Sequence, residues 1–81
     1  MLEELSTKDK VVGIKQTRRA VARGAAARVY LASDADSRLT EPLRAMCALS
    51  GVAVVGDVTM QQLGRACAIA VGTAACAVLA K

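Results

Sequence analysis

Two spacings of apolar residues alternate along the chain. Ile14, Thr17 and Val21 recur at intervals of three and four, the spacing that places side chains on one face of a helix, and a second such group ends at Ser50. Short apolar runs rich in β-branched residues lie between the helical segments and are typical of buried strands. We expect helices over residues 2–10, 15–23, 40–50 and 59–67, and strands over residues 11–12, 28–32, 52–55 and 73–80.

Individual residues mark several of the expected helix ends. Gly24 and Gly51 follow the second and third helices, and glycine tolerates the left-handed backbone with which many helices end. Pro42 is acceptable because it would fall in the first turn of the third helix. Thr59 and Gln62 have capping-box spacing, which predicts a helix start there. The residues expected on one side of the third helix are Leu39, Leu43, Met46 and Cys47.

The order of elements predicts an α/β fold. Strands and helices alternate as βαβαβαβ, which favours a three-layer α/β/α sandwich with a four-stranded mixed sheet. The last segment, Thr73–Ala80, is uniformly apolar, as a strand covered on both faces would be, although its alanines leave a helix as the alternative. At 81 residues the chain should form a single domain, residues 1–81. With 17 alanines and one aromatic residue, Tyr30, its core must bring backbones close together.

Positive charge is concentrated near the start of the chain. Between Lys8 and Arg28 there are seven Lys and Arg residues against one acid, Asp9, whereas the remainder has four basic and six acidic residues. Lys15, Arg19 and Arg23 recur every four residues and therefore stand in one row. Such a patch fits a polyanionic partner, and a merely solvated helix face is the alternative explanation.

Catalytic and metal-binding patterns are missing from the sequence. The segment after Gly13 matches neither nucleotide-binding glycine motif. Asp34 and Asp36 sit in a turn-forming segment, where capping explains them better than hydrolysis or magnesium binding. Three scattered cysteines without histidine do not make a zinc site, and we expect buried, reduced thiols. We therefore expect no enzyme, no cofactor and no metal, with a small thiol enzyme as a remote alternative class.

Nucleic acid is the favoured partner, and the aromatic content narrows its type. Modules that stack unpaired bases need aromatic platforms, which a chain with a single tyrosine lacks. A helix start beside Lys15 and Gln16 instead offers free backbone amides to phosphate. The lysine can bind a phosphate or a guanine edge, and the glutamine amide can both donate to and accept from a base. This combination suits a structured RNA with an exposed groove edge.

Four segments together resemble a known family. GIKQTRRAVARG, VYLASDAD, SGVAVV and TMQQLGRACAIAVGTAACAV, in this order, are similar to the kink-turn-binding superfamily of large-subunit ribosomal proteins seven-Ae and thirty-e, and most to its small bacterial members. The most specific parts are Gly13 with the helix start, the pair Leu63–Gly64, and the loop Ile69–Gly72. The resemblance covers residues 8–79 and implies an α/β/α sandwich.

The resemblance also implies a function: binding of kink-turns, which are sharply bent RNA duplexes with tandem sheared G·A pairs. In the family a G-x-N-E-x-x-K segment reads the guanine edges of these pairs; Lys15 and Gln16 replace Asn and Glu, and Arg19 replaces the lysine. An apolar loop covers the extruded base, and here Ala68 and Ala70 stand where relatives often have a glycine and a polar residue. Core packing is the alternative explanation for Ile69 and Val71. The expected RNA-binding residues are Gly13, Ile14, Lys15, Gln16, Thr17, Arg19, Arg23, Ile69, Ala70 and Val71.

Partners and location follow as expectations. The leading hypothesis is a monomeric, cytoplasmic protein that stabilises kink-turns in ribosomal or regulatory RNA. The alternative is a ribosome-associated protein that uses the same fold for other structured RNA or for a protein partner. The charged start MLEELSTKDK is unlike a signal peptide, and the uncharged run Ala66–Ala80 is shorter than the roughly 20 residues of a membrane helix, so no membrane partner is expected.

Overall fold

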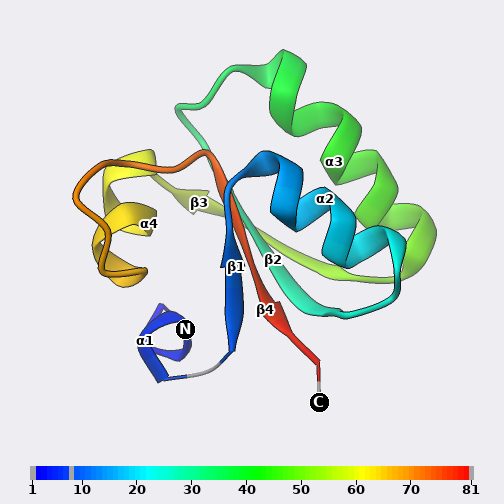
Figure 1. Ribbon diagram of the computed structural model, residues 1–81. Coiled ribbons are helices and arrows are strands. Elements are labelled where there is room, and N and C mark those ends of the chain that lie inside the picture. Colours follow the sequence, from blue (N-terminus) through cyan, green and yellow to red (C-terminus); the bar gives the residue numbers. More distant parts are fainter. Residues whose placement is uncertain (1, 8, 81) are drawn as a thin grey trace.

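A computed structural model describes residues 2–7 and 9–80 and shows a mixed sheet between two layers of helices (Figure 1). Helices and strands alternate along the chain after a short first helix, as the apolar spacing predicted. The elements are α1 (Glu4–Thr7), β1 (Lys10–Val12), α2 (Ile14–Ala22), β2 (Ala26–Ala32), α3 (Ser37–Ser50), β3 (Ala53–Val58), α4 (Met60–Ala66) and β4 (Ala75–Leu79).

The four strands form one sheet in the order β1-β4-β2-β3. The last strand, β4, lies between β1 and β2 and is antiparallel to both, whereas β2 and β3 are parallel. Residues Ala75–Val78 of β4 are buried. A central strand covered on both faces has few positions that favour polar residues. This explains its uniformly apolar sequence and resolves the helix-or-strand alternative in favour of a strand.

Each face of the sheet carries its own apolar core. On one face Tyr30, Cys76 and Val78 pack with Leu5 of α1 and Leu63 of α4. On the other face β2 and β4 contribute to a cluster with α2 and α3, whose buried members are Val21, Val29, Leu31, Leu43, Cys47, Ala75 and Ala77. Alternate residues of a strand point to opposite faces, so the two central strands supply both cores. The predicted three-layer α/β/α sandwich with a mixed four-stranded sheet is confirmed.

The predicted helix caps are present. Thr59 and Gln62 form the capping box at α4, with Thr59 N–H donating to Gln62 Oε1 at 2.8 Å and Gln62 N–H donating to Thr59 Oγ1 at 3.2 Å. Asp36 caps α3 and accepts from the Arg38 N–H at 2.9 Å, and Asp34 accepts from the Met60 N–H at 2.8 Å. The interpretation of both aspartates as capping residues is thus confirmed. Each closes the start of a different helix.

Helix α3 is longer than predicted. It begins at Ser37 rather than near residue 40, because Asp36 caps it. Pro42 therefore lies in the second turn, where it removes a hydrogen bond to the Arg38 carbonyl, and the first-turn interpretation was wrong. The expectation for Leu39 also fails in part, since its side chain is 50% exposed while Leu43 is buried.

The remaining differences concern element lengths. Helix α1 covers only Glu4–Thr7, because the chain turns there to enter β1; residue 8 of the expected helix lies outside the described residues. Strand β3 runs on through Gly56 and Asp57, which are residue types depleted in strands. Val55 and Val58 on either side of them pair with Tyr30 and Ala32 of β2, and Gly56 and Asp57 form the irregularity between these two pairs. Helix α1 is attached to the sheet through Glu4, which accepts from the Tyr30 hydroxyl and the Arg28 guanidinium.

Candidate nucleic-acid interface

Helix α2 begins without a side-chain cap. Its N-cap is Gly13, whose φ of 100° is a left-handed value that favours glycine, and no side chain is present to accept from the first helical amides. The N–H groups of Ile14, Lys15 and Gln16 have no intrahelical partner by the geometry of a helix start. Because the helix dipole adds partial positive charge at the same place, this end of α2 favours an anion.

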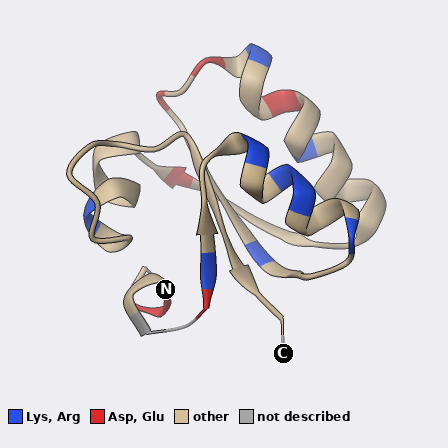
Figure 2. Ribbon diagram, in the orientation of Figure 1, with Lys and Arg blue, Asp and Glu red and all other residues tan. Residues whose placement is uncertain are grey.

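The row of cations on α2 faces solvent, as predicted. Lys15, Gln16, Arg19 and Arg23 are exposed, and α2 contains no acidic residue. Figure 2 shows this helix as the element with several basic bands and no red one. Among the described residues the ion pairs join Arg28 to Glu4, Arg38 to Asp36, and Arg44 to Glu41, so the α2 cations are left unneutralised by them.

Two of the expected site residues on α2 turn inward to different degrees. Ile14 is half-buried and packs on the core shared with α3. Thr17 is fully buried, and its hydroxyl oxygen has no hydrogen-bond partner within residues 2–7 and 9–80. The Thr17 N–H donates to the Gly13 carbonyl at 2.9 Å, which closes the first turn. Its side chain therefore supports the position of α2 and does not itself reach solvent.

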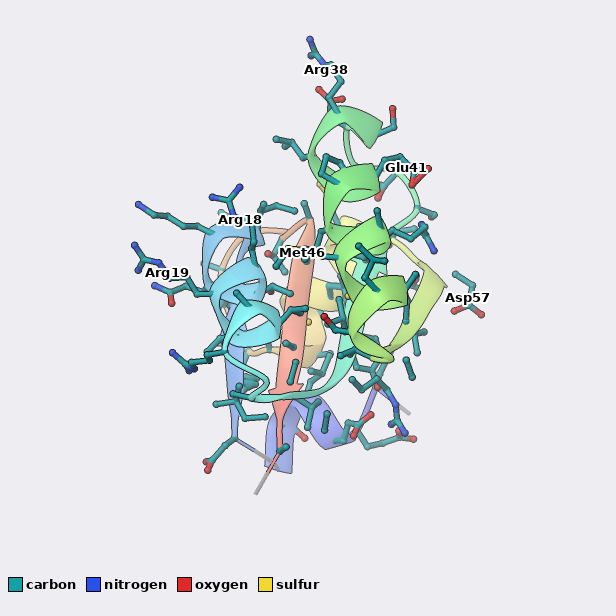
Figure 3. All side chains as sticks on the ribbon, turned by 90° about the vertical axis from the view of Figure 1, so that its right-hand side faces the viewer. Arg18, Arg19, Arg38, Glu41, Met46 and Asp57 are labelled. Carbon is teal, nitrogen blue, oxygen red and sulfur yellow. The ribbon has the colours of Figure 1, made fainter. Side chains whose placement is uncertain are left out.

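Arg18 is an exposed cation that the row of four-residue spacing did not include. In Figure 3, Arg18 and Arg19 both project from α2 away from its neighbour α3, while Met46 of α3 lies between the two helices. Arg18 is one of the seven basic residues that the sequence places between Lys8 and Arg28, although it was not among the expected RNA-binding residues. Arg18 enlarges the exposed, positively charged surface around the start of α2. We call this surface, formed by Lys15, Gln16, Arg18, Arg19 and Arg23, the cationic surface.

An exposed apolar loop connects α4 to β4. Val71 is 72% exposed and Ile69 is 37% exposed, and Ala70 between them is also exposed. Contiguous exposed apolar side chains are a common feature of binding surfaces. These exposures contradict the alternative explanation of Ile69 and Val71 as core residues. We call residues 68–74 the apolar loop.

Two glycines let the apolar loop lie directly on α4. A Cβ at Gly64 would come within 2.3 Å of the Val71 carbonyl oxygen, and one at Gly72 within 3.1 Å of the Met60 backbone. The Thr73 N–H donates to the Met60 carbonyl at 3.2 Å and fixes the end of the loop. This close backbone approach explains physically why the Leu63–Gly64 pair and the loop glycine occur together.

The start of α2 and the apolar loop lie at the same end of the sheet. Gly13 follows β1, and its N–H donates to the carbonyl of Ala75, the first residue of β4, at 2.8 Å. The loop ends at residue 74, directly before this contact, and Ala74 accepts from the Ala32 N–H at 2.8 Å. In Figure 1 the orange loop and the blue start of α2 flank the tops of β1 and β4. The structure therefore brings the two predicted parts of the site to the same end of the sheet.

On the α1 side of the sheet, outside the candidate interface, the pKa of Tyr30 is raised. Burial, and then the hydrogen bond to Glu4, raises the pKa of Tyr30 to about 12.

Over residues 2–7 and 9–80 no three His, Cys, Asp or Glu side chains gather closely enough to hold a metal ion. No helix in this part of the chain is long and apolar enough to cross a membrane.

Known proteins resemble this chain over most of its length. It is 45% identical to an RNA-binding protein of Geobacillus kaustophilus over 69 residues, covering 85% of this chain and 84% of the relative. It is 41% identical to an RNA-binding protein of Caldanaerobacter subterraneus over 68 residues, covering 84% and 83%. The solved structure of the Giardia lamblia 15.5kD RNA binding protein matches with a TM-score of 0.88 and 28% identity, covering 99% of this chain and 68% of that one. The profile of the Ribosomal protein L7Ae/L30e/S12e/Gadd45 family matches residues 2–81, and the chain therefore belongs to this family.

Proposed function

We propose that residues 1–81 act as a single RNA-binding domain that recognises and stabilises kink-turn RNA. The observation that carries this proposal is the juxtaposition of an uncapped, cationic helix start with an exposed apolar loop at one end of the sheet. A plain polyanion-binding patch would need the cations alone. RNA binding is also what the names of the relatives and of the Giardia lamblia protein describe.

The start of α2 is the part that reads the tandem G·A pairs. Lys15 donates to acceptors on the guanine edges, and the Gln16 amide accepts from guanine donors and donates in return. Both side chains are exposed, and Gly13 keeps the approach open because it has no side chain. Gln16 has one accepting oxygen where the family has a carboxylate with two, so its preference for G·A pairs rests on fewer strong bonds.

The other residues bind the RNA phosphates or cover the extruded base. Arg19, Arg23 and the first amides of α2 contact phosphates, where charge gives affinity without sequence information. Ile69, Ala70 and Val71 cover the base that the kink extrudes and remove its apolar face from water. Ile14 and Thr17 hold α2 in register against the core.

These different roles of the side chains explain why the protein would prefer the bent form of the RNA. The cations bind straight and bent RNA similarly, whereas the guanine edges and the extruded base meet the protein together only in the bent form. A ligand that binds one conformer better shifts the population toward it by its difference in affinity. The expected activity is thus stabilisation of the kink in a ribosomal or regulatory RNA in the cytoplasm, by a monomer and without a chemical reaction.

The test is a binding titration against two hairpins at two salt concentrations. One hairpin carries a three-nucleotide bulge followed by tandem G·A pairs, and the other has these pairs converted to Watson–Crick pairs. Gln16→Ala should weaken binding to the first hairpin by about tenfold to a hundredfold, the worth of one good base contact, and leave the second unchanged. Gln61→Ala, an exposed glutamine on α4, is the matched control and should change neither.

A phosphate contact should behave differently from a base contact. Arg23→Gln should weaken both hairpins alike and lower the slope of log affinity against log salt by about one. Equal, strongly salt-dependent binding of the natural protein to both hairpins would contradict kink-turn recognition. That result would favour the alternative hypothesis, a basic protein of this family that binds other structured RNA or a protein partner on the ribosome.

A further inference from the structure

The apolar loop doubles back along α4. It leaves the end of this helix and returns to its first residue, Met60, where the Thr73 N–H donates to the Met60 carbonyl at 3.2 Å. In Figure 1 the loop accordingly runs beside α4 before the chain enters β4. One side of the loop therefore faces the helix. Residues 68–72 of this stretch are all exposed.

Several polar backbone groups of the loop are turned toward α4. The Ala68 N–H donates to the Arg65 carbonyl at 3.1 Å. The Ile69 N–H donates to the Gly64 carbonyl at 3.0 Å, and the two bonds together form a pattern with which helices often end. The Val71 carbonyl oxygen lies so close to Gly64 that a Cβ there would come within 2.3 Å of it. These groups therefore face the helix and not a ligand on the outer side of the loop.

The side chains of the exposed stretch carry no polar atom. Residues 68–72 are alanine, isoleucine, alanine, valine and glycine. Thr73, the first polar side chain after them, is buried, and its hydroxyl donates to the Ala75 carbonyl at 3.0 Å. The side chains that meet a ligand on this stretch are therefore apolar. They can cover a surface, but they cannot donate or accept a hydrogen bond.

The start of α2 has the opposite chemistry. Lys15 and Gln16 are exposed and end in an ammonium group, which donates hydrogen bonds, and an amide, which both donates and accepts them. Such groups can distinguish one base edge from another. The two parts of the candidate interface thus differ in what they can recognise, although they lie at the same end of the sheet.

The identity of a nucleobase is carried by its edges. The four bases differ in the donors and acceptors along these edges, whereas every base has two flat faces. Covering a face gives affinity in proportion to the apolar area removed from water, with little dependence on which base is covered. A loop whose exposed side chains are all apolar suits the face of a base and does not distinguish its edges.

We propose that the apolar loop binds the extruded nucleotide of a kink-turn by the face of its base, without selecting among the four bases. The ligand of this part of the interface is therefore any nucleobase. This inference rests on the proposed function, because it concerns the base that the kink extrudes. It assigns sequence selection to the start of α2 alone, which reads the tandem G·A pairs, while the loop accepts every base at the extruded position.

The experiment first locates the extruded nucleotide. Each of the three bulge nucleotides of the G·A hairpin is replaced in turn by an abasic nucleotide, and the affinity of the natural protein is measured. At one position the loss of the base should weaken binding by roughly tenfold, since a covered base face is lost. That position then carries A, C, G or U in four otherwise identical hairpins. We expect their four affinities to agree within about threefold.

Val71→Ala tests whether the loop itself is responsible. Val71 is 72% exposed, so the substitution removes apolar surface without opening the core. It should weaken binding to all four hairpins alike, by about threefold, and leave binding to the abasic hairpin unchanged. A residue that only supported the fold would affect the abasic hairpin as well. Leu49→Ala is the matched control, because Leu49 of α3 is 91% exposed and its truncation should change none of these affinities.

Three results would overturn the proposal. A preference of about tenfold or more for one base would show that a polar group of the loop backbone reads its edge. The second is that no abasic substitution weakens binding, and the third is that Val71→Ala weakens the abasic hairpin as much as the others. Failure of the proposed function gives a different result, because the natural protein would then bind the G·A and Watson–Crick hairpins equally.

Discussion

Gly64→Ala is the substitution whose effect the structure defines most closely. A Cβ at this position would lie 2.3 Å from the Val71 carbonyl oxygen and 3.0 Å from the Cα of Gly72. Since side-chain carbons do not approach other atoms closer than about 3.0 Å, the carbonyl must retreat by roughly 0.7 Å. The atom in the way belongs to the backbone, which is anchored by the Thr73 N–H to Met60, so it cannot rotate aside as a side chain would.

The size of the effect follows from two opposing contributions. Alanine in a helix interior is more favourable than glycine by about 0.5–1 kcal/mol, and overpacking a filled site costs about 1–3 kcal/mol. Because the clash is with backbone, we expect the cost to win and the free energy of unfolding to fall by about 1–2 kcal/mol. Displacement of Val71 should also weaken binding to the bulged G·A hairpin while leaving binding to the Watson–Crick hairpin unchanged.

The assay is urea unfolding followed by far-ultraviolet circular dichroism, combined with the hairpin titration. Gly56→Ala is the matched control, since the atoms nearest to its added Cβ would be those of the Arg44 guanidinium, the first at 3.1 Å, and that side chain is flexible and exposed. Its stability should stay within about 0.5 kcal/mol of the natural protein. If Gly64→Ala unfolds at the same urea concentration as Gly56→Ala, the argument from close packing of the loop on α4 is wrong.

Three further predictions concern single side chains. Ala68→Gly should stabilise the protein by about 0.5–1 kcal/mol in urea unfolding, because Ala68 has a φ of 60°; Ala70→Gly, at a residue outside that region, should not stabilise it. Thr17→Val should stabilise the protein by about 1 kcal/mol, since the Thr17 hydroxyl is buried without a partner among the described residues. It should leave the affinity for the hairpins unchanged. Weaker RNA binding by this variant would show that the hydroxyl reaches the RNA. Tyr30 should lose its proton near pH 12 in an absorbance titration at 295 nm, with no other tyrosine and no tryptophan to interfere. Its raised pKa contributes stability below pH 10 that is lost as the pH rises from 10 to 12, and in Tyr30→Phe this loss should be absent.

The elements that could be predicted are those with local causes. The capping box at Thr59 and Gln62 and the left-handed glycines at residues 24 and 51 depend on neighbours within four residues. The outward row of cations on α2 depends only on helical spacing. The start of helix α3 was placed near residue 40, because the short polar side chains of the segment that includes Asp34 and Asp36 favour turns as well as helix starts. Only the packing shows that Asp34 instead accepts from Met60, at the start of a different helix.

In the candidate site, too, some features could be predicted from the sequence and others depend on the packing. Its residue types and its family resemblance could be seen in the sequence, whereas the burial of Thr17 and the exposure of Val71 could not. Whether a valine faces core or solvent depends on what packs against it. Here the contact of the loop with α4 through Gly64 turns Val71 outward. The strand extension of β3 through Gly56 and Asp57 is likewise an effect of its neighbour β2.

The sequence by itself determined the alternation of helices and strands up to residue 67 and the basic character of one helix, and it left the last apolar segment open between strand and helix. These depend on periodicity and residue type, which act over a few residues. The tertiary structure alone decided that the start of α2 and the apolar loop lie at the same end of the sheet. This arrangement joins residues far apart in the chain, and it exists because β4 inserts between β1 and β2 in the sheet.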